Sequence, residues 1–308
     1  MTKRPITNVA ASVRDRLLNR ARQTGEDFQF LLQRYAAERL LYRMGQSAHR
    51  DRFVLKGAML FALWGGSVYR PTRDLDFTGY GDSGAESVIS AFKEICTVTV
   101  PDDGLAFDAG TVTAEPIRDE AEYGGLRVRL RALLGNARID MQIDIGFGNA
   151  IEPGANDVQY PTLLGAPAPH IRAYPQESVV AEKLHTLVVL GERTTRMKDL
   201  YDLSTLATQF AFDGTRLTGA IAATFKRRKT KIEPALPAGL ASRFFADDAR
   251  ATLWRAYLDR NNLPGAPRDF AQAGERIQAF LGPVWSAFVA GDGFASSWRP
   301  GGPSEAES

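Results

Sequence analysis

The chain has 308 residues, of which 44% are hydrophobic and 24% charged, a composition typical of globular proteins and long enough for two packed domains. The net charge of only +2 does not indicate a nucleic-acid partner, so any basic surface has to be local. The single cysteine, Cys96, excludes a disulfide within the chain, and one cysteine with three histidines argues against a zinc site. No apolar run approaches about 18 residues and no signal peptide is present, so we expect a cytoplasmic protein without a membrane partner.

Apolar residues recur at helical spacing between Thr7 and Gly45, and the pair Thr24-Gly25 interrupts them, which predicts two helices. This segment is basic. The arginines of this segment, together with Arg50 shortly after it, are Arg14, Arg16, Arg20, Arg22, Arg34, Arg39, Arg43 and Arg50. Either a solvated helix face or a contact with nucleic acid explains them, and the sequence does not decide between the two.

The next stretch, residues 53–77, reads FVLKGAMLFALWGGSVYRPTRDLDF. It predicts a strand at Phe53–Leu55, a turn at Gly57, a helix at Ala58–Trp64, a loop and a strand at Asp74–Thr78. Glycine lets a backbone or a phosphate approach closely where a helix begins, and helix N-termini favour anions. Gly57 is therefore a candidate phosphate-binding position.

The second of these strands carries two carboxylates, Asp74 and Asp76. Residues two apart in a strand share one face, so both carboxylates point the same way while Leu75 and Phe77 point into the core. Two carboxylates on one face repel each other unless a cation lies between them. Carboxylate oxygens suit a hard ion such as Mg²⁺.

A helix at about Ala85–Ile95 is followed by period-two patterns, which predict strands at Phe107–Ile117, Leu126–Leu134 and Arg138–Ile145. In the middle strand the arginines at 127, 129 and 131 share one face, which is either solvent-facing or in contact with RNA. In the last strand, Asp140, Gln142 and Asp144 share a face opposite the apolar side chains.

Proline and glycine between Glu152 and Pro169 predict a linker. Tyr174-Pro175 then opens the first of two helices, which are separated at Gly191. Lys183 lies in the middle of the first. Asp199 and Asp202 lie three residues apart in the second, and therefore on one face.

Beyond residue 212 the chain is mainly helical in pattern. The run FKRRKTK, residues 225–231, is either a solvated helix end or a grip on the phosphate backbone of RNA. The polar, Pro/Gly-rich C-terminus is typical of disorder.

A glycine turn after a strand, followed by an Asp-x-Asp strand, resembles the signature of DNA polymerase β-like nucleotidyltransferases. The string LKGAMLFALWGG…YRPTRDLDF is similar, more narrowly, to the AbiEii/AbiGii toxins of toxin–antitoxin pairs. The chain departs from the family at Gly57-Ala58, where Gly-Gly or Gly-Ser is usual. The lysine of an AEK-like helix, Lys183, and a KD-x-x-DL helix that begins at Lys198-Asp199 also match. The resemblance covers roughly residues 50–270.

The resemblance implies an α+β fold with a polymerase β-like mixed sheet flanked by helices and a C-terminal helical domain. We expect N-terminal helices in 1–50, the nucleotidyltransferase core in 51–170, a helical domain in 171–290 and a disordered tail in 291–308.

The resemblance also implies a site for two Mg²⁺ ions and a nucleoside triphosphate. The expected metal ligands are Asp74, Asp76 and a third carboxylate from a later strand, for which Asp144 matches the family pattern best and Asp140 competes. Lys183 and Arg70 are expected to contact the triphosphate, together with Gly57, and Asp199 to orient Lys183 or the attacking hydroxyl.

The implied function is toxin-type transfer of a nucleoside monophosphate from an NTP to RNA. The expected acceptor is the 3′ end of tRNA, which would block translation, and the expected partner is a cognate antitoxin. Thr72 matches a hydroxyl position that some relatives use for inhibitory phosphorylation. Two alternatives stay open: a nucleotidyltransferase that modifies a small molecule or a protein, and a non-catalytic nucleotide-binding module.

Overall fold

The computed structural model describes residues 8–65, 70, 72, 74–117, 124–263, 265–291, 294 and 296–302. Contacts between Cα atoms divide the chain into two compact units. The first contains Met1–Gly65, Pro71–Gly148 and Asn156–Ala173, and the second contains Gly66–Arg70, Asn149–Ala155 and Tyr174–Ser308. No helix among the described residues is long and apolar enough to span a membrane.

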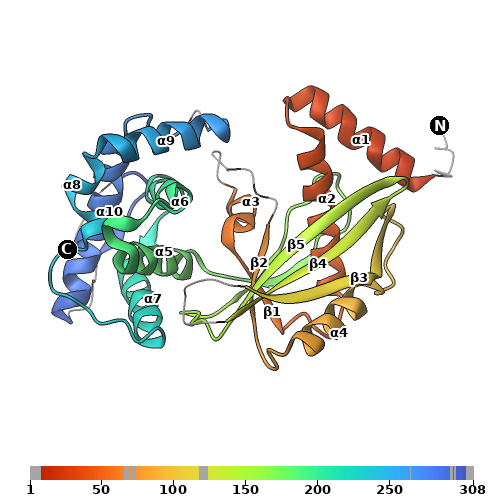
Figure 1. Ribbon diagram of the computed structural model, residues 1–308, viewed down its shortest axis with the longest axis horizontal. Helices are drawn as coiled ribbons and strands as arrows, with labels where there is room; N and C mark the ends of the chain where they lie inside the picture. Colours follow the sequence, from red (N-terminus) through yellow and green to blue (C-terminus); the bar gives the residue numbers. More distant parts are fainter. Residues whose placement is uncertain are drawn as a thin grey trace. The chain divides into compact units, whose positions relative to one another are not determined.

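The first unit is built on a mixed seven-stranded sheet with the order β3-β4-β5-β2-β1-β7-β6 (Figure 1). The strands are β1 Phe53–Lys56, β2 Leu75–Gly79, β3 Leu105–Ile117, β4 Gly125–Leu134, β5 Ala137–Phe147, β6 Asn156–Gln159 and β7 His170–Ala173. β2 runs parallel to β5, and β1 runs parallel to β7. The other neighbouring strands are antiparallel.

The predicted alternation in β4 and β5 is confirmed, because the side chains of Val128, Ile143 and Ile145 are fully buried. The apolar face of the sheet packs against α2 (Phe28–Gly45) and α4 (Ala85–Cys96). The rings of Phe53 and Phe92, for example, lie 5.3 Å apart. The two predicted N-terminal helices are also present, as α1 (Val9–Thr24) and α2.

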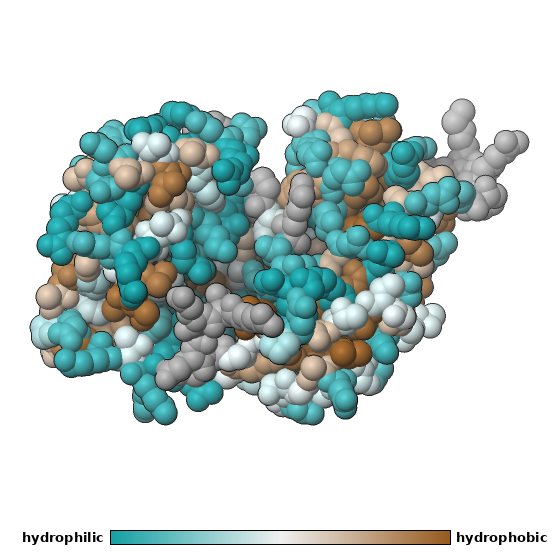
Figure 2. All heavy atoms as spheres, viewed as in Figure 1, coloured by the Kyte–Doolittle hydropathy of each residue, from teal (hydrophilic) through white to brown (hydrophobic). Residues whose placement is uncertain are grey.

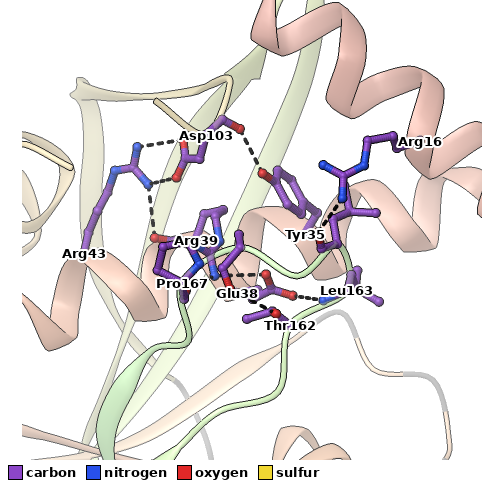
Figure 3. Close-up of polar contacts among 11 residues, drawn as sticks. Arg16, Tyr35, Glu38, Arg39, Arg43, Asp103, Thr162, Leu163 and Pro167 are labelled. Atoms are coloured by element: carbon purple, nitrogen blue, oxygen red, sulfur yellow. Dashed lines mark hydrogen bonds and ion pairs between the residues drawn. The ribbon is translucent and has the colours of Figure 1, made fainter. Parts of the chain in front are cut away.

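Two of the N-terminal arginines lie in the core rather than on a solvated or nucleic-acid-binding surface (Figure 3). Arg39 is 1% exposed and Arg43 is 5% exposed. Arg43 pairs with Asp103 at 2.6 Å, and Arg39 pairs with Glu38 at 3.0 Å. Burial of these guanidinium groups is possible because each has a carboxylate partner.

The Pro/Gly-rich stretch for which the sequence predicts a linker contains β6, which pairs with β7. Its loop is fastened to α2, since Glu38 Oε2 accepts a hydrogen bond from the Leu163 amide at 2.7 Å and Arg39 Nη2 donates to the Pro167 carbonyl at 2.9 Å (Figure 3). β6 has only four residues, of which Asn156, Asp157 and Gln159 are exposed, so no apolar alternation marks it as a strand.

The second unit is mainly helical (Figure 1). Its helices are α5 Gln176–Leu190, α6 Met197–Gln209, α7 Gly214–Arg227, α8 Ser242–Phe245, α9 Asp248–Arg260 and α10 Phe270–Ala290. Aromatic side chains form much of its core, and Phe225 packs against Trp285 with ring centroids 5.8 Å apart. On the face drawn in Figure 2, hydrophilic side chains cover most of the surface of each unit.

Part of the C-terminal stretch for which the sequence predicts a disordered tail is ordered. β9 (Ser297–Trp298) pairs with β8 (Phe212–Asp213), and Trp298 Nε1 donates a hydrogen bond to the Ala207 carbonyl at 2.7 Å. The buried indole of Trp298 explains the order, because it packs on Phe280. The end of the predicted tail, 303–308, lies outside the described residues.

Candidate active site

The predicted strand–turn–helix–strand unit is present in the first unit. β1 ends at Lys56, a 3₁₀ turn spans Gly57–Met59, and α3 (Leu60–Trp64) follows. α3 has only five residues, so its dipole is much smaller than that of a full helix. The prediction that a helix N-terminus favours an anion at Gly57 therefore has little support from α3.

The backbone of Gly57 instead lies against a carboxylate. Its φ of +75° is a conformation that favours glycine. A Cβ atom built on Gly57 would lie 2.2 Å from Asp76 Oδ2 and 2.9 Å from Asp76 Cγ. The absence of a side chain at residue 57 thus allows the Asp76 carboxylate to lie directly on the backbone of the turn.

Five charged residues form one row across the sheet. Asp76 of β2 pairs in register with Lys56 of β1 on one side and with Asp144 of β5 on the other. Asp144 in turn pairs with Arg127 of β4, and Arg127 pairs with Glu115 of β3. Because neighbouring strands lie about 4.8 Å apart, the carboxylates of Asp76 and Asp144 lie side by side.

The alternative third carboxylate, Asp140, has a different position. Pairing of β2 with β5 begins at Leu75 and Ile143, so Asp140 lies beyond the start of β2. Its side chain pairs with Arg131 at 2.7 Å. The register therefore favours Asp144 over Asp140 as the neighbour of Asp76.

Asp144 is held by a bidentate ion pair. Arg127 Nε lies 2.9 Å from Asp144 Oδ1, and Arg127 Nη2 lies 2.7 Å from Asp144 Oδ2. The hydrogen bond and charge of Asp144, and more weakly the charge of Asp74, raise the pKa of Arg127. Because the charge of Asp74 acts on Arg127, Asp74 lies near the same row. Asp74 itself is exposed and directly precedes β2.

The residues of this row fit a hard divalent cation by the chemistry of their donors. Asp76 and Asp144 offer carboxylate oxygens from adjacent strands, and Asp74 is one pleat away from Asp76. Among the described residues, no three His, Cys, Asp or Glu side chains are already arranged around a metal position. In the row, Asp144 points its oxygens at Arg127.

The second unit gathers the other predicted site residues. Lys183 of α5 contacts two carboxylates of α6, with Nζ 2.8 Å from Asp199 Oδ1 and 2.7 Å from Asp202 Oδ2. Arg196 Nε lies 2.5 Å from Asp199 Oδ2. Arg70 makes a bidentate contact with Asp202, at 2.8 and 3.1 Å.

Burial and charge act in opposite directions on this cluster. Burial by itself raises the pKa of Asp199, but the charges of Lys183 and Arg196 outweigh it and lower that pKa. Burial lowers the pKa of Lys183, but Asp199 and Asp202 outweigh it and raise that pKa. Lys183 is therefore a cation at neutral pH, held by two anions.

The structure adds Asp202 to the predicted set. Its side chain is 1% exposed and joins Lys183 to Arg70, the residue expected to contact phosphate. The spacing of Asp199 and Asp202 shows that they share a helix face, but it does not show that two cations converge there. A signal that was available is the presence of two carboxylates on one face of an otherwise apolar helix, since a buried pair requires cations nearby.

The basic run 225–231 is partly exposed. Lys226, Arg227, Lys229 and Lys231 are exposed, and Lys231 pairs with Glu233 at 2.9 Å. Arg228 turns inward, where it donates a hydrogen bond to His185 Nδ1 at 3.1 Å.

Comparison with known proteins places this geometry in a family. No curated protein matches the sequence. A candidate nucleotidyltransferase from H. pylori is 14% identical, with 87% of this chain and 99% of that chain covered and a TM-score of 0.49. JHP933 from Helicobacter pylori is 15% identical, with 85% and 94% covered and a TM-score of 0.48.

The family model for "Nucleotidyl transferase AbiEii toxin, Type IV TA system" matches residues 39–276, which is most of the chain. The matched range contains the strand–glycine–strand unit, the row of charges across the sheet and the cluster around Lys183. The chain therefore belongs to the AbiEii family of nucleotidyl transferase toxins from type IV toxin–antitoxin systems.

Proposed function

We propose that this nucleotidyl transferase moves a nucleoside monophosphate from an NTP to an RNA acceptor in a Mg²⁺-dependent reaction, with the 3′ end of tRNA as the acceptor. The observation that carries the proposal is the register of Asp76 with Asp144 on adjacent parallel strands, next to the turn at Gly57. Modification of the acceptor end would stop aminoacylation and hence translation.

The proposed metal ligands are Asp74, Asp76 and Asp144. When bound, Mg²⁺ supplies charge neutralisation at the phosphates and a lowered pKa for the attacking hydroxyl. The absence of a side chain at Gly57 leaves room for the Asp76 carboxylate beside the turn. Asp144, which accepts two hydrogen bonds from Arg127, would be the third carboxylate ligand.

The proposed triphosphate ligands are Lys183 and Arg70. Lys183 is a permanent positive charge, because Asp199 and Asp202 raise its pKa. Asp199 orients the ammonium group, from which it accepts a hydrogen bond at 2.8 Å. Asp202 does the same for both cations.

Two further features support a nucleic-acid acceptor and a protein partner. The exposed cations Lys226, Arg227 and Lys229 stand at the end of α7, where a phosphate backbone has access to them. Membership of a type IV toxin–antitoxin family implies a cognate antitoxin. We propose that both encounters take place in the cytoplasm.

The proposal is tested by incubating the protein with Mg²⁺, each labelled NTP in turn, and total tRNA. Wild type is compared with Asp76→Ala, and Asp144→Ala is compared with Asp140→Ala. The second pair is matched, because both residues lie on the same face of β5 but only Asp144 pairs with Asp76.

We expect label to enter tRNA with wild type and Asp140→Ala, and not with Asp76→Ala or Asp144→Ala. Labelled protein or small molecule in place of tRNA would replace the proposed acceptor. No transfer to any acceptor by folded wild type that binds Mg²⁺–NTP would favour a non-catalytic nucleotide-binding module.

A further inference from the structure

One arginine of the sheet contacts a proposed metal ligand directly. Arg127 of β4 grips both oxygens of Asp144, and Asp144 stands in register between Arg127 and Asp76. The side chains of Arg127 and Asp144 are 31% and 23% exposed, so both are partly accessible to solvent and ions. Figure 1 shows β4 and β5 side by side in this sheet.

The same strand provides two arginines for comparison. Arg129 pairs with Glu115 of β3 at 2.5 Å, and Arg131 pairs with Asp140. Glu115 lies in register with Arg127 at the end of the row farthest from Lys56, and Asp140 lies outside the row. Neither carboxylate is next to Asp76, whose neighbours in the row are Lys56 and Asp144. Arg127 therefore differs from its neighbours on β4 in the carboxylate that it engages, and not in residue type or strand face.

The position of Arg127 has an electrostatic reason. Asp76 and Asp144 lie on adjacent strands in register, so their negative charges repel each other in the absence of a cation. A guanidinium group matches both oxygens of a carboxylate and offsets this repulsion. A divalent cation would do the same with higher charge, and it would need the same oxygens.

We propose that Arg127 is a positioning residue that holds Asp144 in the metal-free protein and competes with the divalent cation for the Asp144 carboxylate. The inference rests on the proposed function, since it takes Asp144 as a metal ligand. Metal binding releases the guanidinium from Asp144. Arg127 thus stabilises the empty site and weakens the affinity of the site for the metal.

The test is Mn²⁺ binding, measured by isothermal titration calorimetry and by the Mn²⁺ electron paramagnetic resonance signal. The proteins are wild type, Arg127→Gln and Arg131→Gln, and Arg131→Gln is the control that removes an arginine from the same face of β4, where its partner Asp140 lies outside the row. We expect Arg127→Gln to bind Mn²⁺ about three- to tenfold more tightly than wild type, and Arg131→Gln to bind like wild type. Thermal unfolding should show a lower Tm for Arg127→Gln without metal and a larger rise when Mn²⁺ is added.

A purely structural role would only lower stability, and it would not tighten metal binding. Equal or weaker Mn²⁺ binding by Arg127→Gln than by wild type would overturn the inference, even if wild type transfers nucleotides normally. If Arg127→Gln does not fold, Arg127→Lys serves instead, because lysine keeps the charge without the bidentate grip and should give an intermediate affinity. Absence of Mn²⁺ binding by wild type and Arg127→Gln alike would overturn both this inference and the proposed metal site.

Discussion

Replacement of Gly57 by alanine tests whether the turn after β1 exists to accommodate the Asp76 carboxylate. The substitution has two effects, backbone strain at a φ of +75° and a collision of the new Cβ atom with Asp76. Gly81 separates them, since its φ is +78° and a Cβ atom there would meet nothing within 4 Å. Gly81→Ala is therefore the matched control.

The strain is common to both variants and amounts to about 1–2 kcal/mol. The collision belongs to Gly57→Ala alone. Its Cβ atom would lie 2.2 Å from Asp76 Oδ2, where 3.4 Å is an ordinary contact, so the carboxylate has to move by roughly 1 Å. Rotation of the carboxylate does not suffice, because Asp76 Cγ and Cβ would still lie at 2.9 and 3.0 Å.

A displacement of about 1 Å at a proposed metal ligand is expected to lower kcat/KM for nucleotide transfer about 100-fold. The assay is transfer of labelled NTP, with thermal unfolding to compare stability. We expect both variants to lose the stability that corresponds to the backbone strain, Gly57→Ala to lose more because of the collision, and only Gly57→Ala to lose activity. Equal activity of Gly57→Ala and Gly81→Ala, both folded, would refute the reasoning.

Three further predictions concern buried charges. Asp202→Asn removes the anion that Arg70 and Lys183 share, and we expect it to lower the free energy of unfolding in urea by about 3 kcal/mol. Asp259→Asn, which breaks an exposed ion pair with Arg268, should change this free energy little. Burial and the charge of Arg228 lower the pKa of His185 in the folded state to about 4. As the pH falls from 6.5 towards 4, the imidazole of the unfolded state is therefore protonated before that of the folded state, and the free energy of unfolding decreases. His185→Gln should flatten that part of the curve of Tm against pH, and an unchanged curve would contradict the assignment. Burial raises the pKa of Glu38, so above pH 4.5 its carboxyl group stays protonated in the folded state when it has already ionised in the unfolded state. The free energy of unfolding therefore decreases as the pH rises, and Glu38→Gln should remove this dependence on pH.

Much of the fold could be predicted from the sequence because it depends on neighbours in the chain. Alternating apolar residues mark β4 and β5, and helical spacing marks α1 and α2, with boundaries close to those of the structure. The unit from β1 to β2 could also be predicted, because a glycine turn and an Asp-x-Asp strand are local features. Residue type and spacing thus determined the strand that begins beside Asp74 and contains Asp76, and the resemblance of the motifs identified the family that the family model confirms.

Tertiary structure decided what depends on residues far apart in the chain. The choice between Asp140 and Asp144 required the register of β2 with β5, which a period of two leaves undefined. The burial of Arg39, the grip of Arg127 on Asp144 and the two cations on Asp202 depend on which charges meet in space. A charged side chain looks the same in sequence whether water or a carboxylate solvates it, and only packing selects between the two.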